Sequence, residues 1–150
     1  MQLSQKETTI LQDLKSQEQL CVTKYEKYAN AACDEQLKKL FMEIGQMEQT
    51  HLDTVNSMLS GTIPMMTGGG QQSGGAQPQQ SSCSPEEQKM DAYLCQDVLG
   101  TEKHVSHTYD TGVFEFKDAN ARDTLNHIQK EEQQHGKRIY DYMAVNGMYS

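Results

Sequence analysis

The sequence has no apolar run that approaches the roughly 20 residues needed to cross a bilayer. It therefore predicts no membrane insertion. The first seven residues, Met-Gln-Leu-Ser-Gln-Lys-Glu, also lack the apolar stretch of a signal peptide. We therefore expect synthesis in the cytoplasm without a signal peptide.

Positive charge is scarce as well. The chain has 13 Lys and Arg against 21 Asp and Glu, which gives a formal net charge of −8. Nucleic acids and anionic membranes are themselves polyanionic, so a chain with this balance is not attracted to them. The composition therefore predicts no nucleic-acid partner.

The four cysteines have no Cys-x-x-Cys spacing, which excludes a rubredoxin-type iron site and a thioredoxin-type redox pair. Cys21 and Cys95 fall on apolar stripes and are expected to be small core residues. Cys33 and Cys83 fall at a turn and in a linker, where a crosslink can form. The sequence leaves open whether these two cysteines form one.

Only 35% of the residues are hydrophobic, but they recur at helical spacing. The pattern predicts an all-α protein with helices over residues 4–31, 34–60, 85–117 and 118–146, packed as a single domain over residues 1–150. The start signals are a Ser4-x-x-Glu7 capping box, Asp34 and the pair Ser84-Pro85, and Gly61 ends the second helix. In the third helix, Tyr93 is expected to point inward with the leucine and valine side chains.

Residues 61–84 are rich in Gly, Gln, Ser and Pro, and they predict a flexible linker between a hairpin over 4–60 and a hairpin over 85–146. Short turns inside each hairpin make its two helices antiparallel. We expect the two hairpins to be related by a pseudo-twofold axis and to start at the same end of the bundle. The linker must then return along the bundle, and its extended reach of ~75 Å exceeds a helix length of about 40 Å.

The strongest motif is a repeated spacing of acidic residues and histidine. Glu18 is followed thirty residues later by Glu48-x-x-His51, and Glu102 is followed thirty residues later by Glu132-x-x-His135. A Glu-x-x-His pair lies on one face of a helix, so both side chains can reach one metal ion. An offset of 84 residues also aligns the apolar positions of the two halves, which predicts an internal repeat.

Four helices that point four Glu and two His inward carry the ligand set of ferritin-like di-iron or di-manganese bundles. The sequence therefore predicts a ferritin-like four-helix bundle of two antiparallel hairpins with six metal ligands. The predicted ligands are Glu18, Glu48, His51, Glu102, Glu132 and His135.

Buried carboxylates repel one another and lose hydration, so bound cations must compensate for them. Oxygen ligands with one imidazole per metal favour two iron or two manganese ions, and zinc would also bind. We expect Glu48 and Glu132 to bridge or chelate, and each half to add one terminal glutamate and one histidine. The alternative is that the six residues lie on a partly wet face, or share protons and hydrogen bonds without metal.

Several other residues have more than one interpretation. Tyr25 and Tyr109 lie two turns beyond Glu18 and Glu102, so each either donates to a ligand carboxylate or packs in the core. The three histidines outside the predicted ligand set are expected at the surface or beside the ligands. Four further glutamates are expected to be exposed to solvent. They are His104, His107 and His127, and Glu26, Glu43, Glu115 and Glu131. Glu131 would replace Glu132 as a ligand if the last helix were rotated.

The stretch from Leu125 to Gly136, which contains Glu131-Glu132-Gln133-Gln134-His135, resembles the C-terminal signature of the Coat F family of bacterial spore coat proteins. Its continuation to Tyr149, and the helix around Thr101-Glu102-Lys103, are similar to the same family. The resemblance implies an endospore-forming bacterium, expression during sporulation, localisation in the spore coat and other coat proteins as partners.

The wider ferritin-like superfamily implies oxidase, peroxidase or catalase-like chemistry. Rubrerythrins have a similar ligand pattern and commonly carry a rubredoxin domain, which this chain lacks, so a redox reaction would need an external electron donor or be a disproportionation. Val105 and Ser106 stand where a further carboxylate one turn from Glu102 would lie. This departure weighs against rubrerythrin-type peroxidase chemistry.

We therefore expect a structural and protective spore coat protein that retains a dimetal site and forms homo-oligomers. The alternative is a di-iron or di-manganese oxidoreductase acting on peroxide or oxygen. A ferritin-like iron store is disfavoured because no fifth helix is evident. The seven tyrosines, with Cys33 and Cys83, are candidates for crosslinks in a coat layer.

Overall fold

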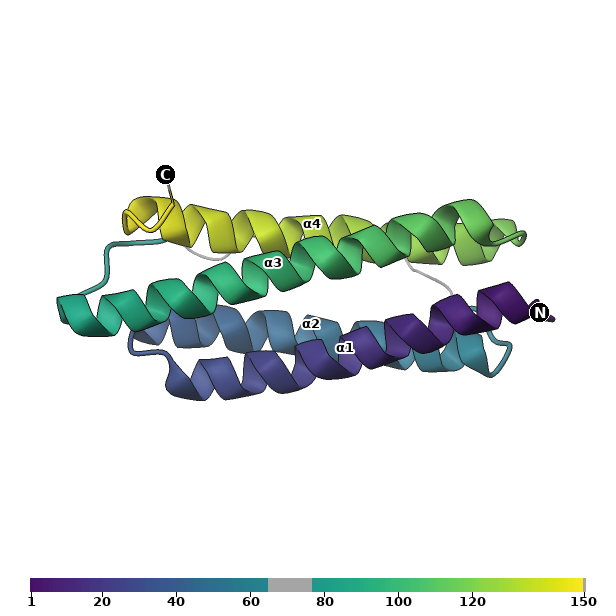
Figure 1. The fold of residues 1–150 in the computed structure, drawn as a ribbon, viewed down its shortest axis with the longest axis horizontal. Helices are drawn as coiled ribbons and strands as arrows, with labels where there is room; N and C mark the ends of the chain where they lie inside the picture. The colour runs from purple at the N-terminus through teal and green to yellow at the C-terminus, as the bar shows by residue number, and fades with distance from the viewer. Residues whose placement is uncertain (65–76, 150) are drawn as a thin grey trace.

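The computed structural model of the protein describes residues 1–64 and 77–149. It contains four helices in these ranges: α1 (Gln5–Ala31), α2 (Glu35–Leu59), α3 (Pro85–Glu115) and α4 (Ala119–Val145) (Figure 1). The fold class is therefore as predicted, and the helix ends lie within about two residues of the predicted ones. Half of the predicted flexible linker, residues 65–76, lies outside the described residues.

Each helix begins at a side chain that accepts a hydrogen bond from the first turn. Ser4 and Ser84 form capping boxes with Glu7 and Glu87, and the carboxylates of Asp34 and Asp118 accept backbone N–H groups. Such caps satisfy N–H groups that have no partner inside the helix. After α2 and α4 the chain turns through glycines with positive φ, 92° at Gly61 and 66° at Gly147. Glycine adopts this conformation without a steric penalty, so both helices end there.

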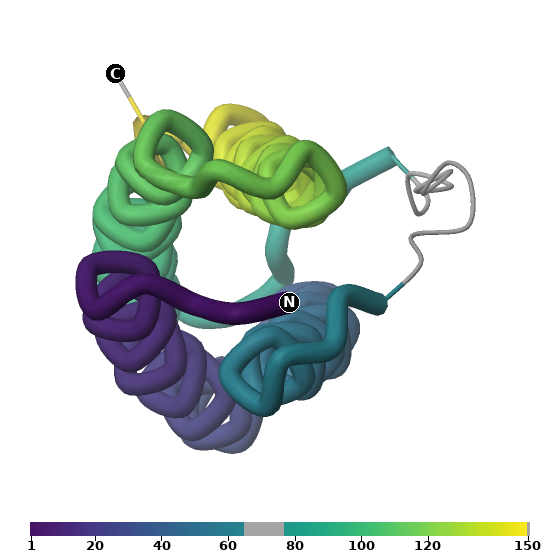
Figure 2. The backbone as a smooth tube through the Cα atoms, turned by 90° about the vertical axis from the view of Figure 1, so that its right-hand side faces the viewer, coloured from purple at the N-terminus to yellow at the C-terminus, as the bar shows by residue number. Residues whose placement is uncertain are grey.

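Viewed along the bundle, the four helices surround a common axis, with α1 next to α2 and α3, and α4 next to α2 and α3 (Figure 2). Helices α1 and α3 are antiparallel. Near the start of α1, Glu7 accepts a hydrogen bond from the N–H of Lys117, just after α3, and near the end of α1, Tyr28 donates to Asp97 in the first half of α3. The expectation that both hairpins start at the same end is therefore wrong. They start at opposite ends, and this is why the connection between them must cross the bundle.

The described parts of the connection lie at the two ends of the bundle. After α2, the carbonyl of Gly61 accepts from the N-terminal ammonium at 3.1 Å. Before α3, Gln79 exchanges hydrogen bonds with Gln36, and the N–H of Ser81 donates to Asn146. Gln36 lies at the start of α2 and Asn146 at the end of α4, so the chain has passed from one end of the bundle to the other (Figure 1).

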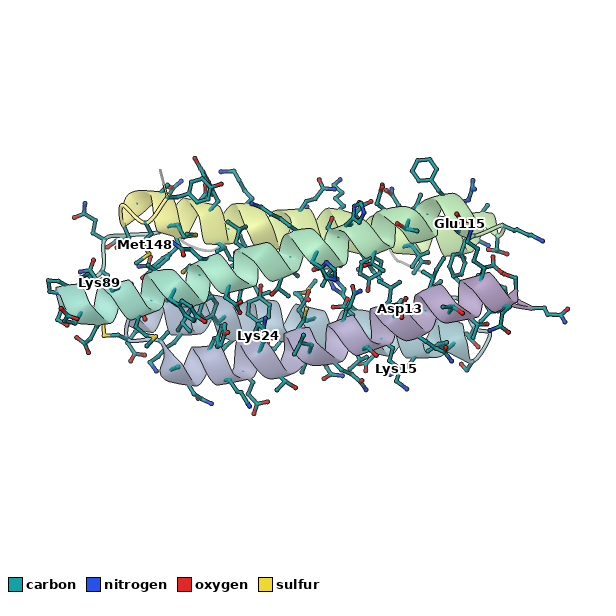
Figure 3. The ribbon with its side chains drawn as sticks, viewed as in Figure 1. Asp13, Lys15, Lys24, Lys89, Glu115 and Met148 are labelled. Carbon is teal, nitrogen blue, oxygen red and sulfur yellow. A yellow bond between two sulfur atoms is a disulfide. The ribbon has the colours of Figure 1, made fainter. Side chains whose placement is uncertain are left out.

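The inner faces of the helices form an apolar core, while charged residues such as Asp13, Lys89 and Glu115 are exposed along the outside (Figure 3). Tyr93 corrects one prediction, because it is 63% exposed. The buried stripe of α3 passes through Leu94, and successive helical residues are about 100° apart, which turns Tyr93 to solvent. In the described part of the chain, no helix has the length and hydropathy that membrane crossing requires.

A disulfide joins Cys33 to Cys83, with 6.5 Å between their Cα atoms. It ties the turn between α1 and α2 to the residues just before α3. Beside it, the buried carboxylate of Asp91 accepts the N–H groups of Cys33 and Asp34 at 2.9 and 3.1 Å. Cys21 and Cys95 are free and buried in the core, as predicted.

Candidate metal centre

The structure brings the six predicted ligands together in the interior of the bundle. Glu18 comes from α1 and Glu102 from α3, while α2 and α4 each supply a Glu-x-x-His pair. All six residues are at most 2% exposed. The i, i+3 spacing places both members of each pair on the inner face of their helix, as the helical period requires.

The donor atoms form two overlapping groups, in each of which all atoms lie within 4.8 Å of one another. One group is Glu18, Glu48, His51 and Glu132, and the other is Glu48, Glu102, Glu132 and His135. Glu48 and Glu132 are common to both groups. This is the arrangement in which two carboxylates can bridge two cations while each cation keeps one glutamate and one imidazole of its own.

Both imidazoles turn Nδ1 toward the carboxylates. His51 Nδ1 lies 2.6 Å from Glu132, 3.2 Å from Glu48 and 3.4 Å from Glu18. His135 Nδ1 lies 3.2 Å from Glu48 and 3.5 Å from Glu102. The two rings are stacked with centroids 5.7 Å apart. In both histidines, Nδ1 is therefore the atom placed to bind a metal.

Without a metal, protons must supply the positive charge of the cluster. Burial raises the pKa of Glu18 to about 7, against the opposing effect of His51. Burial and the neighbouring Glu102 and Glu48 raise the pKa of Glu132 well above its ordinary value. Burial alone would lower the pKa of His135, but Glu102 and Glu48 outweigh it and raise the value to about 9. The carboxylates around His51 raise its pKa in the same way.

Several buried atoms of the cluster lie close to one another but make no hydrogen bond of suitable geometry with any described residue. They include both oxygens of Glu48, both oxygens of Glu132, one oxygen each of Glu18 and Glu102, and both ring nitrogens of His135. Buried polar atoms in proteins are nearly always paired, so a group of this size calls for an explanation. Divalent cations would satisfy these oxygen and nitrogen atoms together, and the donor set suits iron, manganese or zinc.

The two predicted tyrosines hydrogen-bond to carboxylates of the cluster, across the boundary between the hairpins. The hydroxyl of Tyr25 in α1 donates to Glu102 in α3 at 2.5 Å, and the hydroxyl of Tyr109 in α3 donates to Glu18 in α1 at 2.6 Å. Burial and the nearby carboxylates raise both tyrosine pKa values well above the ordinary 10. Both hydroxyls therefore keep their protons and hold one oxygen of each carboxylate in place.

Glu131 corrects a third prediction, because it is 7% exposed rather than solvated. Its Oε1 lies 2.9 Å from Nε2 of His51 and 3.5 Å from Nε2 of His127. Burial would raise the pKa of Glu131, but His51 outweighs it and lowers the value. Glu131 neither replaces Glu132 nor faces solvent. Because it is one residue before Glu132 on α4, its side chain points toward α2, where it contacts Nε2 of His51 on the side away from the cluster. Its place directly before a predicted ligand is the sequence signal that could have identified it.

The remaining residues are placed largely as expected. His104, His107, Glu26 and Glu115 are exposed, and His127 is partly buried beside Glu131. Glu43 is half-buried and forms an ion pair with Arg138 of α4.

The fold is that of the ferritin-like proteins. A two-domain protein of Anabaena variabilis, with DJ-1/ThiJ/PfpI-like and ferritin-like domains, matches 92% of this chain with a TM-score of 0.68 and 18% identity. The chain spans only 36% of that protein. The bacterioferritin-related protein of Bacteroides fragilis, a dodecameric thioferritin, matches 93% of this chain and 84% of its own, with a TM-score of 0.68 and 16% identity. At these identities the likeness concerns the fold alone.

The sequence of the second hairpin also matches a particular domain family. Residues 90–150 match the Coat F domain, so the resemblance found in the sequence is confirmed for this part of the chain. The matched region includes Glu102, Glu132 and His135, which are half of the cluster. No curated protein matches the chain significantly.

Proposed function

We propose that this protein is a spore coat component whose bundle binds two metal ions, iron or manganese by preference and zinc as a further option. The observation that supports the metal site best is the set of buried carboxylate oxygens without partners. The Coat F domain over residues 90–150 supports the location in the coat.

In this proposal, Glu48 and Glu132 would bridge or chelate the two ions. Glu18 and His51 complete one position, and Glu102 and His135 complete the other. Tyr25 and Tyr109 hold the terminal glutamates in orientation, as hydrogen bonds to metal ligands commonly do.

The main contribution of the metal is stability. Ions that bind the folded chain and not the unfolded chain shift the equilibrium toward the fold, which suits a protein of a long-lived coat. We propose other coat proteins and further copies of this chain as its partners.

Elemental analysis of protein purified without chelator tests the proposal. We expect two ions per chain, and their loss on substitution of either bridging position, Glu48→Ala or Glu132→Ala. The matched control is Glu26→Ala, which removes an exposed glutamate of α1. A protein free of metal, or variants that keep the wild-type metal content, would refute the site.

A second candidate function is the reduction of peroxide or oxygen with electrons from an external donor, or the disproportionation of peroxide, which two redox-active ions would catalyse when bound. A surface groove of about 310 Å³ between α1 and α3 favours it. The groove is lined by Gln17 and Thr101, the residues directly before Glu18 and Glu102, so it lies over the turns of α1 and α3 that carry these two glutamates.

Peroxide consumption by the metal-loaded protein separates the two candidates. The stabilising role predicts little or no turnover with both ions bound. The enzymatic role predicts turnover that falls when Leu20→Trp fills the groove and is unchanged when Met42→Trp adds the same side chain at another exposed position.

We also infer that the two halves are an internal repeat. Positions 84 residues apart make equivalent contacts: Glu7 accepts from the N–H of Lys117, and Asp91 accepts from the N–H of Cys33. The hydrogen bonds from Tyr25 to Glu102 and from Tyr109 to Glu18 are related by the same 84-residue offset.

A further inference from the structure

The two imidazoles of the cluster have different surroundings on the side that faces away from the carboxylates. His51 Nε2 lies 2.9 Å from Oε1 of Glu131. His135 Nε2 is buried and has no partner among the residues that the structure describes. The histidines themselves are 1% and 0% exposed, so water at the surface does not compensate for the difference.

The difference originates in one sequence position. The residue before Glu132 is Glu131, whereas the residue before Glu48 is Met47. A carboxylate is a strong hydrogen-bond acceptor, and a thioether sulfur is a weak one. The two Glu-x-x-His units therefore have the same ligands. They differ in the preceding residue, because Glu131 can accept a hydrogen bond from the histidine of the other unit and Met47 cannot do so strongly.

A hydrogen bond on the outer nitrogen determines how well an imidazole binds a metal. When Nε2–H donates to a carboxylate, that proton stays on Nε2, the ring is held in orientation, and Nδ1 is the nitrogen that exchanges its proton for the cation. Nδ1 is the nitrogen that both rings turn toward the cluster. His51 is therefore prepared for a cation, whereas His135 must settle its tautomer and orientation when the ion arrives.

We propose that the two metal positions are inequivalent, and that Glu131 acts as a positioning residue through which the Glu18–His51 position is filled first. This inference rests on the proposed dimetal function. It adds an order of loading and assigns the order to a residue that is not itself a ligand.

The test is a titration of chelator-treated protein with Mn²⁺ alone, in which free Mn²⁺ is followed by its electron paramagnetic resonance signal. We expect two resolved steps in the wild-type protein. Loss of the supporting carboxylate in Glu131→Leu should weaken the first step by about 10- to 100-fold, the usual effect of removing such a partner. Glu131→Gln keeps an accepting oxygen and should restore part of the loss, and the exposed Glu26→Gln should leave both steps unchanged.

The histidine variants test the order of loading even if Glu131→Leu does not fold. His135→Ala should keep the first step at wild-type affinity, and His51→Ala should lose it. Equal losses in the two variants, the reverse pattern, or two wild-type steps of equal affinity would overturn the inference while leaving the dimetal site standing. Wild-type protein that binds no Mn²⁺ would instead refute the proposed function.

Discussion

The metal-free protein should lose stability as the pH rises from about 5 to 9. In the folded chain, the pKa of Glu18 is raised from 4.5 to about 7, and that of His135 from 6.5 to about 9. Both groups thus bind their protons more tightly in the folded state than in the unfolded state. For a raised pKa, the resulting stability is fully present below the unfolded value and disappears as the pH passes the folded value.

The size of the effect follows from these shifts. One pKa unit corresponds to about 1.4 kcal/mol, so either shift alone represents about 3 kcal/mol. The groups share one cluster and titrate together, so the two contributions are not summed. We expect a net loss of about 3 kcal/mol between pH 5 and 9, or roughly 6–12 °C in unfolding temperature for a chain of this size. Glu48 has a lowered pKa, so its contribution changes only at lower pH.

The assay is thermal unfolding of chelator-treated protein at pH 5, 7 and 9, with and without added Mn²⁺. Cations replace the protons of the ligands, so Mn²⁺ should restore stability most at pH 9, and its binding should release protons. His135→Gln should flatten the pH dependence of the metal-free protein, while His107→Gln, at an exposed histidine, should not. Stability that stays constant from pH 5 to 9 in the metal-free wild type would contradict the raised pKa values of Glu18 and His135.

Three further predictions concern the supports of the fold and the cluster. Removal of the Cys33–Cys83 disulfide, which spans 50 residues, should lower the free energy of unfolding by about 4 kcal/mol, according to the loop-entropy relation. Unfolding with and without reductant measures this difference. A decrease below about 1 kcal/mol would contradict the prediction. Tyr109→Phe should weaken Mn²⁺ binding and cost about 2 kcal/mol of stability, because it removes a buried hydrogen bond to the carboxylate of Glu18. The control Tyr93→Phe, at an exposed position, should have neither effect. Equal effects of the two substitutions would be evidence against the role of Tyr109. Asp91→Ala should destabilise the protein by about 2 kcal/mol or more in urea unfolding, because two backbone N–H groups lose their acceptor, and an unchanged midpoint would count against that role.

The helices and the cluster were predictable because both depend on local spacing. Capping residues such as Ser4 and Ser84 mark helix starts without reference to the rest of the fold. The Glu-x-x-His spacing places a carboxylate and an imidazole on one helical face, and the thirty-residue interval brings the glutamate of the first helix of each hairpin to the height of that pair on the second helix. All six predicted ligands therefore meet in the structure.

The parts that were not predicted depend on how one helix is rotated or placed against another. The burial of Glu131 requires the exact facing of α4 and α2, and the exposure of Tyr93 depends on the rotation of α3. The disulfide requires the α1–α2 turn and the start of α3 to lie at the same end of the bundle. The predicted arrangement, in which both hairpins start at one end, would have kept them at opposite ends. Spacing along a helix does not determine these relations between helices.

The most direct test of the dimetal centre is a crystal structure of the protein grown or soaked with manganous salt, with anomalous difference maps at a wavelength that identifies manganese. We expect two peaks per chain, each between Glu48 and Glu132, one beside His51 and the other beside His135. An absence of both peaks, with the glutamate side chains turned away from one another, would contradict it.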